Sequence, residues 1–174
     1  MKHVKTLLIA VATLIASNAM AQPEAGDINI NAGVGAGLSF ATSGKISLPP
    51  VGLSVDYNLN ERISIGGLVN YSSSNWDYGF GKYKLTYTVI GARVNYHFAS
   101  SETLDPYAGV LLAYNLFNSK WEGTGTDPSY NFGISAFIPG VYVGARYKFS
   151  ETIGIFGEAG YATPYLRAGL NLKF

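Results

Sequence analysis

Apolar and polar residues alternate along most of this chain. Between residues 27 and 40, every even position is apolar and every odd position is polar or glycine. A period of two is typical of a β-strand with one apolar and one polar face. The alternation returns seven more times, so the pattern predicts eight strands, at about residues 27–40, 51–59, 63–71, 83–98, 106–116, 140–149, 153–161 and 166–174.

The connections between these strands predict how they are arranged. The segments 41–50, 72–82 and 117–131 are long and read as loops, whereas Asn60-Glu61, the 100–105 segment and Ser150-Glu151 read as short turns. Alternating long and short connections predict an all-β fold, an eight-stranded antiparallel up-and-down barrel. In bacterial barrels the long loops face outward and the short turns face the periplasm, so we expect both termini in the periplasm.

The first residues have the pattern of an export signal. Lys2 and Lys5 precede an apolar run at 7–16, and Ala19-Met20-Ala21 has the small residues that signal peptidase requires. The run is too short to span a bilayer, which disfavours a retained membrane helix. We therefore expect a signal peptide at 1–21, export through the Sec pathway, and a barrel domain at 22–174.

Composition supports strands that cross a membrane. The mean hydropathy is +0.15 and only 13% of residues are charged, yet no second long apolar stretch follows the signal. Membrane strands distribute their apolar residues in this way. Without residues 1–21, ten basic residues face eleven acidic ones, so we expect no binding to nucleic acid. The chain has no cysteine, which excludes disulfides.

A soluble, lipocalin-like barrel with its apolar face inward is the main alternative. A water-bathed exterior would be rich in charged residues. The polar face here carries few charges and many small residues, Gly33, Gly91, Gly144 and Asn171 among them. Small residues suit the crowded interior of a narrow barrel. The polar face therefore favours the membrane barrel with a polar lumen.

Charged residues on the polar face form the main candidate site. An eight-stranded lumen is just wide enough to be filled by side chains. Glu158 lies one predicted strand after Arg146 and one predicted strand before Arg167. This order predicts an Arg–Glu–Arg bridge. We favour a plug of paired charges that closes the barrel. The alternative is a polar constriction that gates a narrow, porin-like channel for small solutes. The luminal residues of this site are Asp56, Arg93, Arg146, Glu158 and Arg167.

Aromatic residues in the predicted outer loops form a second candidate site. Exposed aromatic side chains in flexible loops can anchor a protein or sugar at a surface. Membrane-interface anchoring explains them equally well. These residues are Trp76, Tyr78, Phe80 and Trp121.

Catalytic and metal chemistry have little support. His97 is the only histidine after the signal, and its neighbours Ser100, Ser101 and Glu102 resemble a triad only by adjacency in a turn. One histidine without cysteine makes a poor metal site. We expect no catalytic residue, no metal and no cofactor, and a lipid A-modifying enzyme is the least favoured reading.

The terminal segment Leu170-Asn171-Leu172-Lys173-Phe174 alternates to an aromatic end. With the strand pattern, it resembles the small eight-stranded outer-membrane barrels of the OmpA and OmpX type, including the porin-like "outer membrane protein β-barrel domain" group. The resemblance implies that Leu170, Leu172 and Phe174 form the signal read by the barrel assembly machinery.

That resemblance also sets the expected location and partners. It implies a cell outer membrane protein of Gram-negative type that contacts outer-membrane lipid, lipopolysaccharide and periplasmic chaperones. Its expected role is structural, or a surface interaction in which loops meet a host or envelope ligand.

Overall fold

The computed structural model describes residues 23–37, 45–78, 81–98, 101, 103–123 and 133–174, without the side chains of Tyr78, Gly123 and Ile134. The predicted signal peptide lies outside these residues. No helix in the described part of the chain has the length and apolarity to cross a bilayer.

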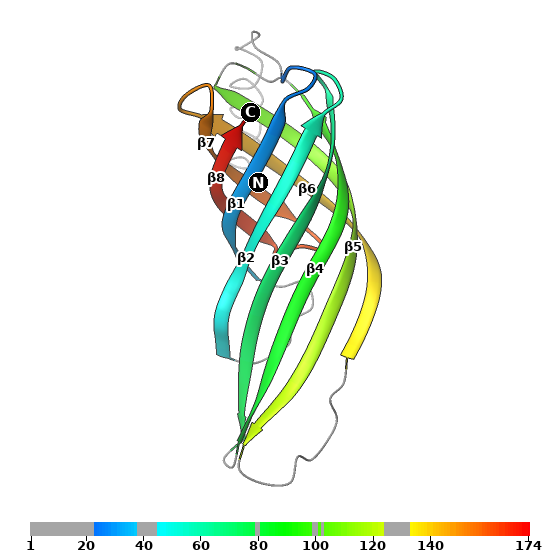
Figure 1. The fold of residues 1–174 in the computed structure, drawn as a ribbon, viewed down its shortest axis with the longest axis vertical. Coiled ribbons are helices and arrows are strands. Elements are labelled where there is room, and N and C mark those ends of the chain that lie inside the picture. The colour runs from blue at the N-terminus through cyan, green and yellow to red at the C-terminus, as the bar shows by residue number, and fades with distance from the viewer. Residues whose placement is uncertain (1–22, 38–44, 79–80, 99–100, 102, 124–132) are drawn as a thin grey trace, which may run out of the picture.

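Eight antiparallel strands form one closed barrel in chain order, with β1 paired to β8 (Figure 1). The predicted strand number, order and closure are confirmed. The strands are β1 (Ile28–Ala36), β2 (Lys45–Asn58), β3 (Ile63–Tyr78), β4 (Gly81–His97), β5 (Leu104–Gly123), β6 (Gly133–Lys148), β7 (Ile153–Gly160) and β8 (Leu166–Lys173).

Several predicted loops are strand, and those boundaries were wrong. β3 and β4 pair without interruption out to Tyr78 and Gly81, so the predicted loop at 72–82 is mostly a hairpin. β5 continues to Gly123, and β2 already begins at Lys45. Pro49 and Pro50 lie within β2, where its register with β3 shifts, as expected for proline in a strand. Polar and aromatic composition resembled loops, although the pairing continues.

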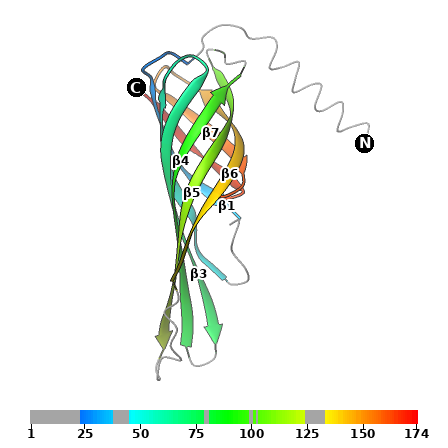
Figure 2. The ribbon, with the colours of Figure 1, turned by 90° about the vertical axis from the view of Figure 1, so that its right-hand side faces the viewer.

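The lengthened strands β3, β4 and β5 project beyond the rest of the barrel, at the end opposite the C-terminus (Figure 2). We call residues 72–78, 81–88 and 115–123 of these strands the β3–β5 extension; β2 pairs with β3 as far as Asn75 and β6 pairs with β5 as far as Asn118.

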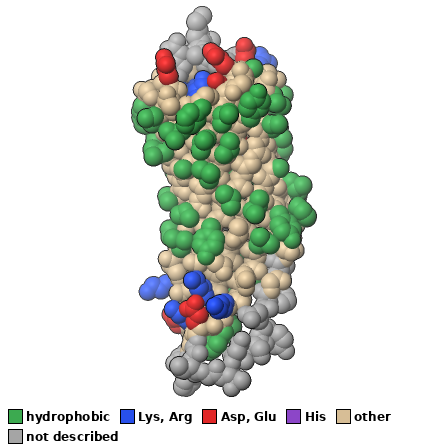
Figure 3. Space-filling view, viewed as in Figure 1, with side chains coloured by type: hydrophobic (Ala, Val, Ile, Leu, Met, Phe, Trp, Pro, Cys, Tyr) green, Lys and Arg blue, Asp and Glu red, His purple; other side chains and the backbone are tan. Residues whose placement is uncertain are grey.

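The barrel has an apolar outside and a polar inside. Large hydrophobic side chains such as Val110, Val141 and Leu170 are exposed, whereas Asn31, Ser54 and many other polar residues are buried. Green apolar side chains cover the middle of the barrel in Figure 3. This inversion contradicts the soluble alternative and matches a barrel surrounded by lipid.

Aromatic side chains gather at the end of the barrel that carries the C-terminus. They are exposed on the outer surface, as an interfacial girdle requires. The members of this girdle are Tyr57, Tyr96, Phe98, Tyr147, Phe149 and Phe174.

Glycines permit the close approach of β1 and β8 that closes the barrel. Gly33 and Gly169 are register partners. A Cβ atom at Gly169 would lie 2.1 Å from the backbone oxygen of Ala32, and one at Gly33 would lie 2.3 Å from that of Ala168. Any side chain here must push the two strands apart.

Replacing Gly169 by alanine should therefore destabilise the barrel. We expect Gly169→Ala to lower the free energy of unfolding by about 1–3 kcal/mol, the usual cost of overpacking. Urea unfolding in lipid vesicles, followed by the gel shift between unheated and boiled samples, measures this. Gly157→Ala is the matched control, because its Cβ would lie 4.0 Å from the nearest atom, the backbone oxygen of Arg167. Equal stability of the two variants would contradict the argument.

Candidate functional site: an ion network across the lumen

Six charged side chains meet inside the barrel. The alternation of each strand turns them inward, and each residue is at most 7% exposed. Three are arginines and three are carboxylates, so their formal charges balance. We call this set the luminal ion network: Asp56 of β2, Arg93 of β4, Asp105 of β5, Arg146 of β6, Glu158 of β7 and Arg167 of β8.

Ion pairs join the six residues into one continuous chain. Arg167 Nη1 lies 3.1 Å from Glu158 Oε2, and Arg93 Nη2 lies 2.7 Å from Glu158 Oε1. Arg93 Nε lies 3.0 Å from Asp56 Oδ1. Arg146 then links Asp56 Oδ2, at 2.5 Å, to the carboxylate of Asp105, at 3.0 Å. Each charge thus has a partner of opposite sign, which offsets the cost of its burial.

One expected pair does not form. Arg146 faces Phe156 in the β6–β7 register, and its guanidinium crosses the lumen to β2 instead of reaching Glu158. Arg93, three strands away from Glu158, takes the expected place in the Arg–Glu–Arg bridge, while Arg167 is a direct register partner of Glu158. In so narrow a lumen, side chains reach strands that are not their neighbours, and strand order does not reveal those contacts.

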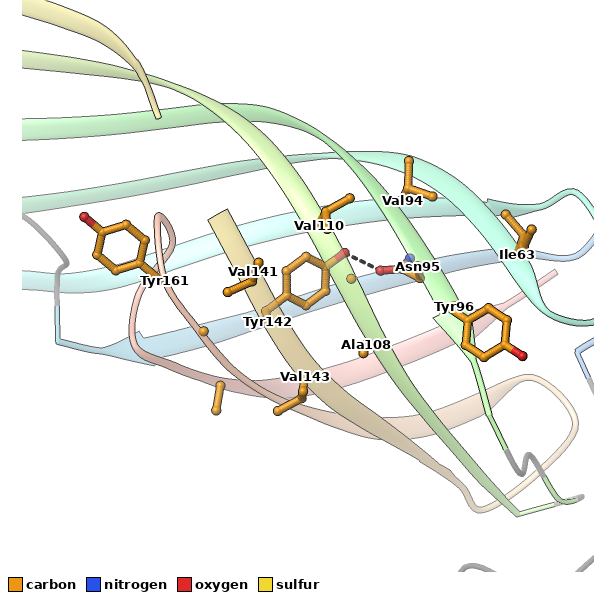
Figure 4. Close-up of a pocket in the computed structure, with 13 residues that line it drawn as sticks. Ile63, Val94, Asn95, Tyr96, Ala108, Val110, Val141, Tyr142, Val143 and Tyr161 are labelled. Atoms are coloured by element: carbon orange, nitrogen blue, oxygen red, sulfur yellow. Dashed lines mark hydrogen bonds between the residues drawn. The ribbon is translucent and has the colours of Figure 1, made fainter. Parts of the chain in front are cut away.

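Two tyrosines pack against the network. The Arg93 guanidinium carbon lies 4.5 Å from the ring centre of Tyr142, and that of Arg146 lies 4.5 Å from the ring centre of Tyr107. The Tyr107 hydroxyl donates a hydrogen bond to Glu158 Oε1 at 2.8 Å. The Tyr142 hydroxyl donates to Asn95 (Figure 4). These aromatic rings fill the space between the charges.

Sequence reasoning missed Asp105, Tyr107 and Tyr142 as parts of this site. Asp105 was assigned to the predicted turn at 100–105, but it is the second residue of β5. Tyr142 was not predicted to belong to the site. The sequence does carry a signal that Asp105 and Tyr107 point inward, because both have the same parity in β5 as Leu111. In the structure all three residues are buried.

His97 connects the network to a polar cluster next to it. Its Nδ1 lies 2.7 Å from Asp105 Oδ1, and its Nε2 lies 2.9 Å from the hydroxyl of Ser64. This order of groups resembles a Ser–His–Asp triad. Ser64 is 0% exposed, however, so a substrate has no access to its hydroxyl in this state. Asn95 donates to the same hydroxyl, which identifies a hydrogen-bonded polar cluster.

Of the three residues whose adjacency to His97 resembles a triad, the structure describes only Ser101, which exchanges hydrogen bonds with the backbone of Leu104 in the turn. Ser100 and Glu102 lie outside the described residues. Among the residues that the structure describes, no group of three or more histidine, cysteine, aspartate or glutamate side chains could hold a metal ion.

The loop aromatics lie in strands of the β3–β5 extension. Trp76 of β3 pairs with Tyr83 of β4, which in turn pairs with Trp121 of β5. The Tyr83 and Trp121 ring centres are 4.7 Å apart. Tyr83 was not predicted. Phe80 lies outside the described residues, as does the side chain of Tyr78.

The row of three aromatic residues is on the face that continues the lumen. Trp76 has the same parity in β3 as Ser64, Leu68 and Asn70, which are buried inside the barrel. The lipid-facing residues of β3, such as Tyr71, have the opposite parity. This placement disfavours the membrane-anchoring interpretation of Trp76 and Trp121.

The terminal residues complete the β1–β8 seam. Leu170, Leu172 and Phe174 all point outward and are exposed. The backbones of Phe174 and Ile28 exchange two hydrogen bonds, each of 2.9 Å. Phe174 is therefore paired with Ile28, the first residue of β1.

Comparison with known protein families identifies the family of this barrel. The sequence pattern of the family described as "Outer membrane protein beta-barrel domain" matches residues 6–174. The chain belongs to this family. It is accordingly an outer-membrane β-barrel protein of porin-like type. The comparison with curated proteins gave no match.

Solved structures share the fold at low sequence identity. The attachment invasion locus protein Ail of Yersinia pestis is 14% identical, with a TM-score of 0.58 over 87% of this chain and 100% of Ail. Neisserial surface protein A is 18% identical, with a TM-score of 0.59 over 87% of this chain and 98% of its own. OprG of Pseudomonas aeruginosa is 13% identical, with a TM-score of 0.60 over 88% of this chain and 98% of its own.

Removing one carboxylate from the luminal ion network should be costly. Asp56→Asn leaves Arg93 and Arg146 buried without their shared counter-charge, and breaking a buried pair costs about 3–5 kcal/mol. We expect a loss of this size in the free energy of unfolding, measured by urea titration in vesicles. Lys82→Gln removes the exposed Lys82–Glu122 pair, 3.4 Å apart, and should cost at most about 1 kcal/mol. A loss below about 1 kcal/mol for Asp56→Asn would contradict a stabilising network.

Proposed function

We propose that this protein is a closed outer-membrane barrel with a structural or surface-interaction role, without catalytic activity. The observation that carries this proposal is the luminal ion network, whose chain of ion pairs crosses the lumen from Arg167 to Asp105. A solute could pass only if several buried pairs separated. Eight strands leave little additional room, since the lumen is just wide enough for side chains.

The proposed orientation puts both termini and the short turns in the periplasm and the β3–β5 extension outside the cell. Support comes from the connections: β2–β3 and β6–β7 are joined through residues 59–62 and 149–152, whereas the other end has connections at 37–44 and 124–132. The 79–80 connection is short, but the strands on either side of it carry the chain outward. Sec export after cleavage at residue 21 is part of the same proposal.

The β3–β5 extension is the proposed surface for an outside partner. It reaches furthest from the barrel and presents Trp76, Tyr83 and Trp121 in one row. Among the similar structures, Ail of Yersinia pestis has been solved in complex with the heparin analogue sucrose octasulfate. That complex supports, by analogy of fold, a surface ligand of the host or the envelope.

The proposed assembly signal is the outward row Leu170, Leu172 and Phe174. The barrel assembly machinery and periplasmic chaperones would receive the chain before β8 pairs with β1. Closure then removes both sheet edges, which lipid cannot satisfy by hydrogen bonding. The two backbone hydrogen bonds between Phe174 and Ile28 support a role in that closure.

A narrow porin-like channel is the second candidate. Arg93 Nη1 and Arg167 Nε and Nη2 are buried without a hydrogen-bond partner among the described residues. Buried polar groups of this kind commonly bind internal water. A lumen that admits water at these positions could conduct small ions if the ion network opened.

Conductance separates the two candidates. We expect no stepwise conductance from the wild-type barrel in planar bilayers, and none from Glu158→Gln, because Arg93, Tyr107 and Tyr142 still fill the lumen. Lys173→Gln is the control, since it removes the Lys173–Asp27 pair, 2.7 Å apart, away from the network. Wild-type steps that change with Glu158→Gln but not with Lys173→Gln would reject the plug and establish a pore through the network.

A further inference from the structure

Aromatic side chains form two rows on the inner face of the β3–β5 extension, the face that continues the lumen. Trp76, Tyr83 and Trp121 form the outer row. Nearer the barrel, Tyr87 of β4 and Phe117 of β5 are register partners, and their ring centres are 4.9 Å apart. These two residues lie four positions along their strands from Tyr83 and Trp121, so the rows share a face and are about 13 Å apart. We call these five residues the aromatic platform.

The indole of Trp121 lies over the backbone of β4 at Gly81. A Cβ atom at Gly81 would lie 2.3 Å from Cζ2 and 2.6 Å from Cη2 of Trp121, so the indole occupies the space that a side chain would fill. The ring of Tyr83 packs against it, with ring centres 4.7 Å apart. Trp76, in the same row, is 41% exposed. A glycine in the neighbouring strand thus positions the indole on the inner face.

Hydroxyl groups accompany the aromatic rings. Tyr83, Tyr87 and Ser119 are all half-buried, so each residue keeps some contact with solvent. Ser119 stands between the two rows, because it is two residues from Phe117 and two from Trp121 in β5. Each of these hydroxyls can donate and accept a hydrogen bond. The inner face therefore combines aromatic surface with neutral polar groups.

No charged side chain lies on the inner face within the described part of the extension. The charged residues of these segments all have the opposite parity and face outward: Asp77, Lys82, Lys84, Lys120 and Glu122. An ionic ligand at the aromatic platform would give up its hydration without gaining a partner of opposite charge, which is costly. The platform therefore favours a neutral occupant.

A chain of pyranose sugars matches these groups. One face of a pyranose ring presents C–H groups, whose slightly positive hydrogens are attracted to the negative face of an aromatic ring. The hydroxyls around the sugar edge are donors and acceptors, as are those of Tyr83, Tyr87 and Ser119. Because the two aromatic rows are about 13 Å apart, contact with both requires more than one sugar unit.

A peptide that adds a strand to the sheet fits less well. Strand addition needs a free sheet edge. β2 pairs with β3 as far as Asn75, and β6 pairs with β5 as far as Asn118. Within the described strands, only the last few residues of β3 and β5 therefore have a free edge. The aromatic platform lies on the face of the sheet, which a flat ring can contact without such an edge.

We propose that the aromatic platform binds an uncharged oligosaccharide. One sugar ring stacks at Tyr83 and Trp121, and another lies at Tyr87 and Phe117. Such a ligand differs in charge from sucrose octasulfate, the heparin analogue that was solved in complex with Ail. This inference rests on the proposed surface role of the extension and names the class of ligand for it.

Tryptophan fluorescence of the folded barrel in lipid nanodiscs tests this inference. The chain has two tryptophans, Trp76 and Trp121, so all tryptophan emission comes from the platform. The neutral probes are maltohexaose, chitohexaose and a hexasaccharide of alternating galactose and N-acetylglucosamine, and a heparin hexasaccharide is the anionic comparison. We expect acrylamide to quench the free protein. At least one neutral hexasaccharide should protect the emission in a saturable way, and the heparin hexasaccharide should not.

Calorimetry on variants measures which residues hold the bound neutral hexasaccharide. Trp121→Ala should weaken binding by about tenfold or more, as is usual when a stacking ring is removed. Gly81→Ala should weaken it too, because a Cβ atom there displaces the indole while every aromatic residue remains. Phe137→Ala is the matched control and should leave the affinity unchanged. The ring centres of Phe137 and Tyr114 are also 4.7 Å apart, but on the lipid-facing surface, where Phe137 is 69% exposed.

The gel shift between unheated and boiled samples confirms that each variant is folded. Absence of binding by all three neutral hexasaccharides would overturn the proposal, as would equally tight binding of the heparin hexasaccharide. Equal affinity of wild type and folded Trp121→Ala would place the sugar elsewhere and reject the platform. Emission that acrylamide cannot quench in the free protein would mean that the platform is already covered, which also rejects the proposal.

Labelling of intact cells separates failure of this inference from failure of the proposed surface role. A Glu122→Cys variant provides a single thiol on the outer face of the extension, since the chain has no other cysteine. Reaction with an impermeant maleimide on intact cells is the expected result. If the thiol reacts only after lysis, the surface role is wrong and the sugar proposal, which rests on it, fails as well. If it reacts on intact cells but no neutral hexasaccharide binds, only the sugar proposal is wrong.

Discussion

Pairing of buried charges inside a narrow lumen is the interaction on which the rest of this structure depends. Closing eight strands into a barrel removes the sheet edges but leaves an interior too narrow for bulk water. The polar side chains on the inner faces of the strands must therefore form hydrogen bonds and ion pairs with one another. Three arginines and three carboxylates do so in one chain of ion pairs, and Tyr107 and Tyr142 fill the space around it. The side chains that allow closure therefore also occupy the lumen.

The distribution of side chains changes where the strands leave the barrel. Within the barrel the outer face is apolar and the inner face polar, as lipid outside and a crowded lumen inside require. In the β3–β5 extension the inner face carries Trp76, Tyr83 and Trp121, while the outer face carries charged residues such as the paired Lys82 and Glu122. The same alternation of inward and outward residues thus continues from the barrel into the extension, but with different side chains on each face. The proposed functions follow from this division, because in a barrel whose lumen is filled by side chains the outward-projecting sheet is the surface that we propose for recognition.

Local periodicity predicted the fold, but it could not predict contacts across the lumen. The period of two identified eight strands and the inward direction of Asp56, Arg93, Arg146, Glu158 and Arg167, because parity is a local property. The link from Arg93 to Glu158 depends on the register of several strands at once. Strand ends were also missed: residues 72–78 continue the pairing with β4, but their serine and aromatic content resembles a loop. Asp105 was assigned to the predicted turn at 100–105, although it is the second residue of β5.

A double-mutant cycle on Asp56 and Arg146 tests the central claim most directly. Free energies of unfolding are measured for wild type, Asp56→Asn, Arg146→Gln and the double variant in the same vesicles. If the two residues share a buried ion pair, the double variant should lose less stability than the two single losses together, with a coupling of about 1–3 kcal/mol. Additive losses within about 0.5 kcal/mol would contradict an ion network that holds the lumen closed.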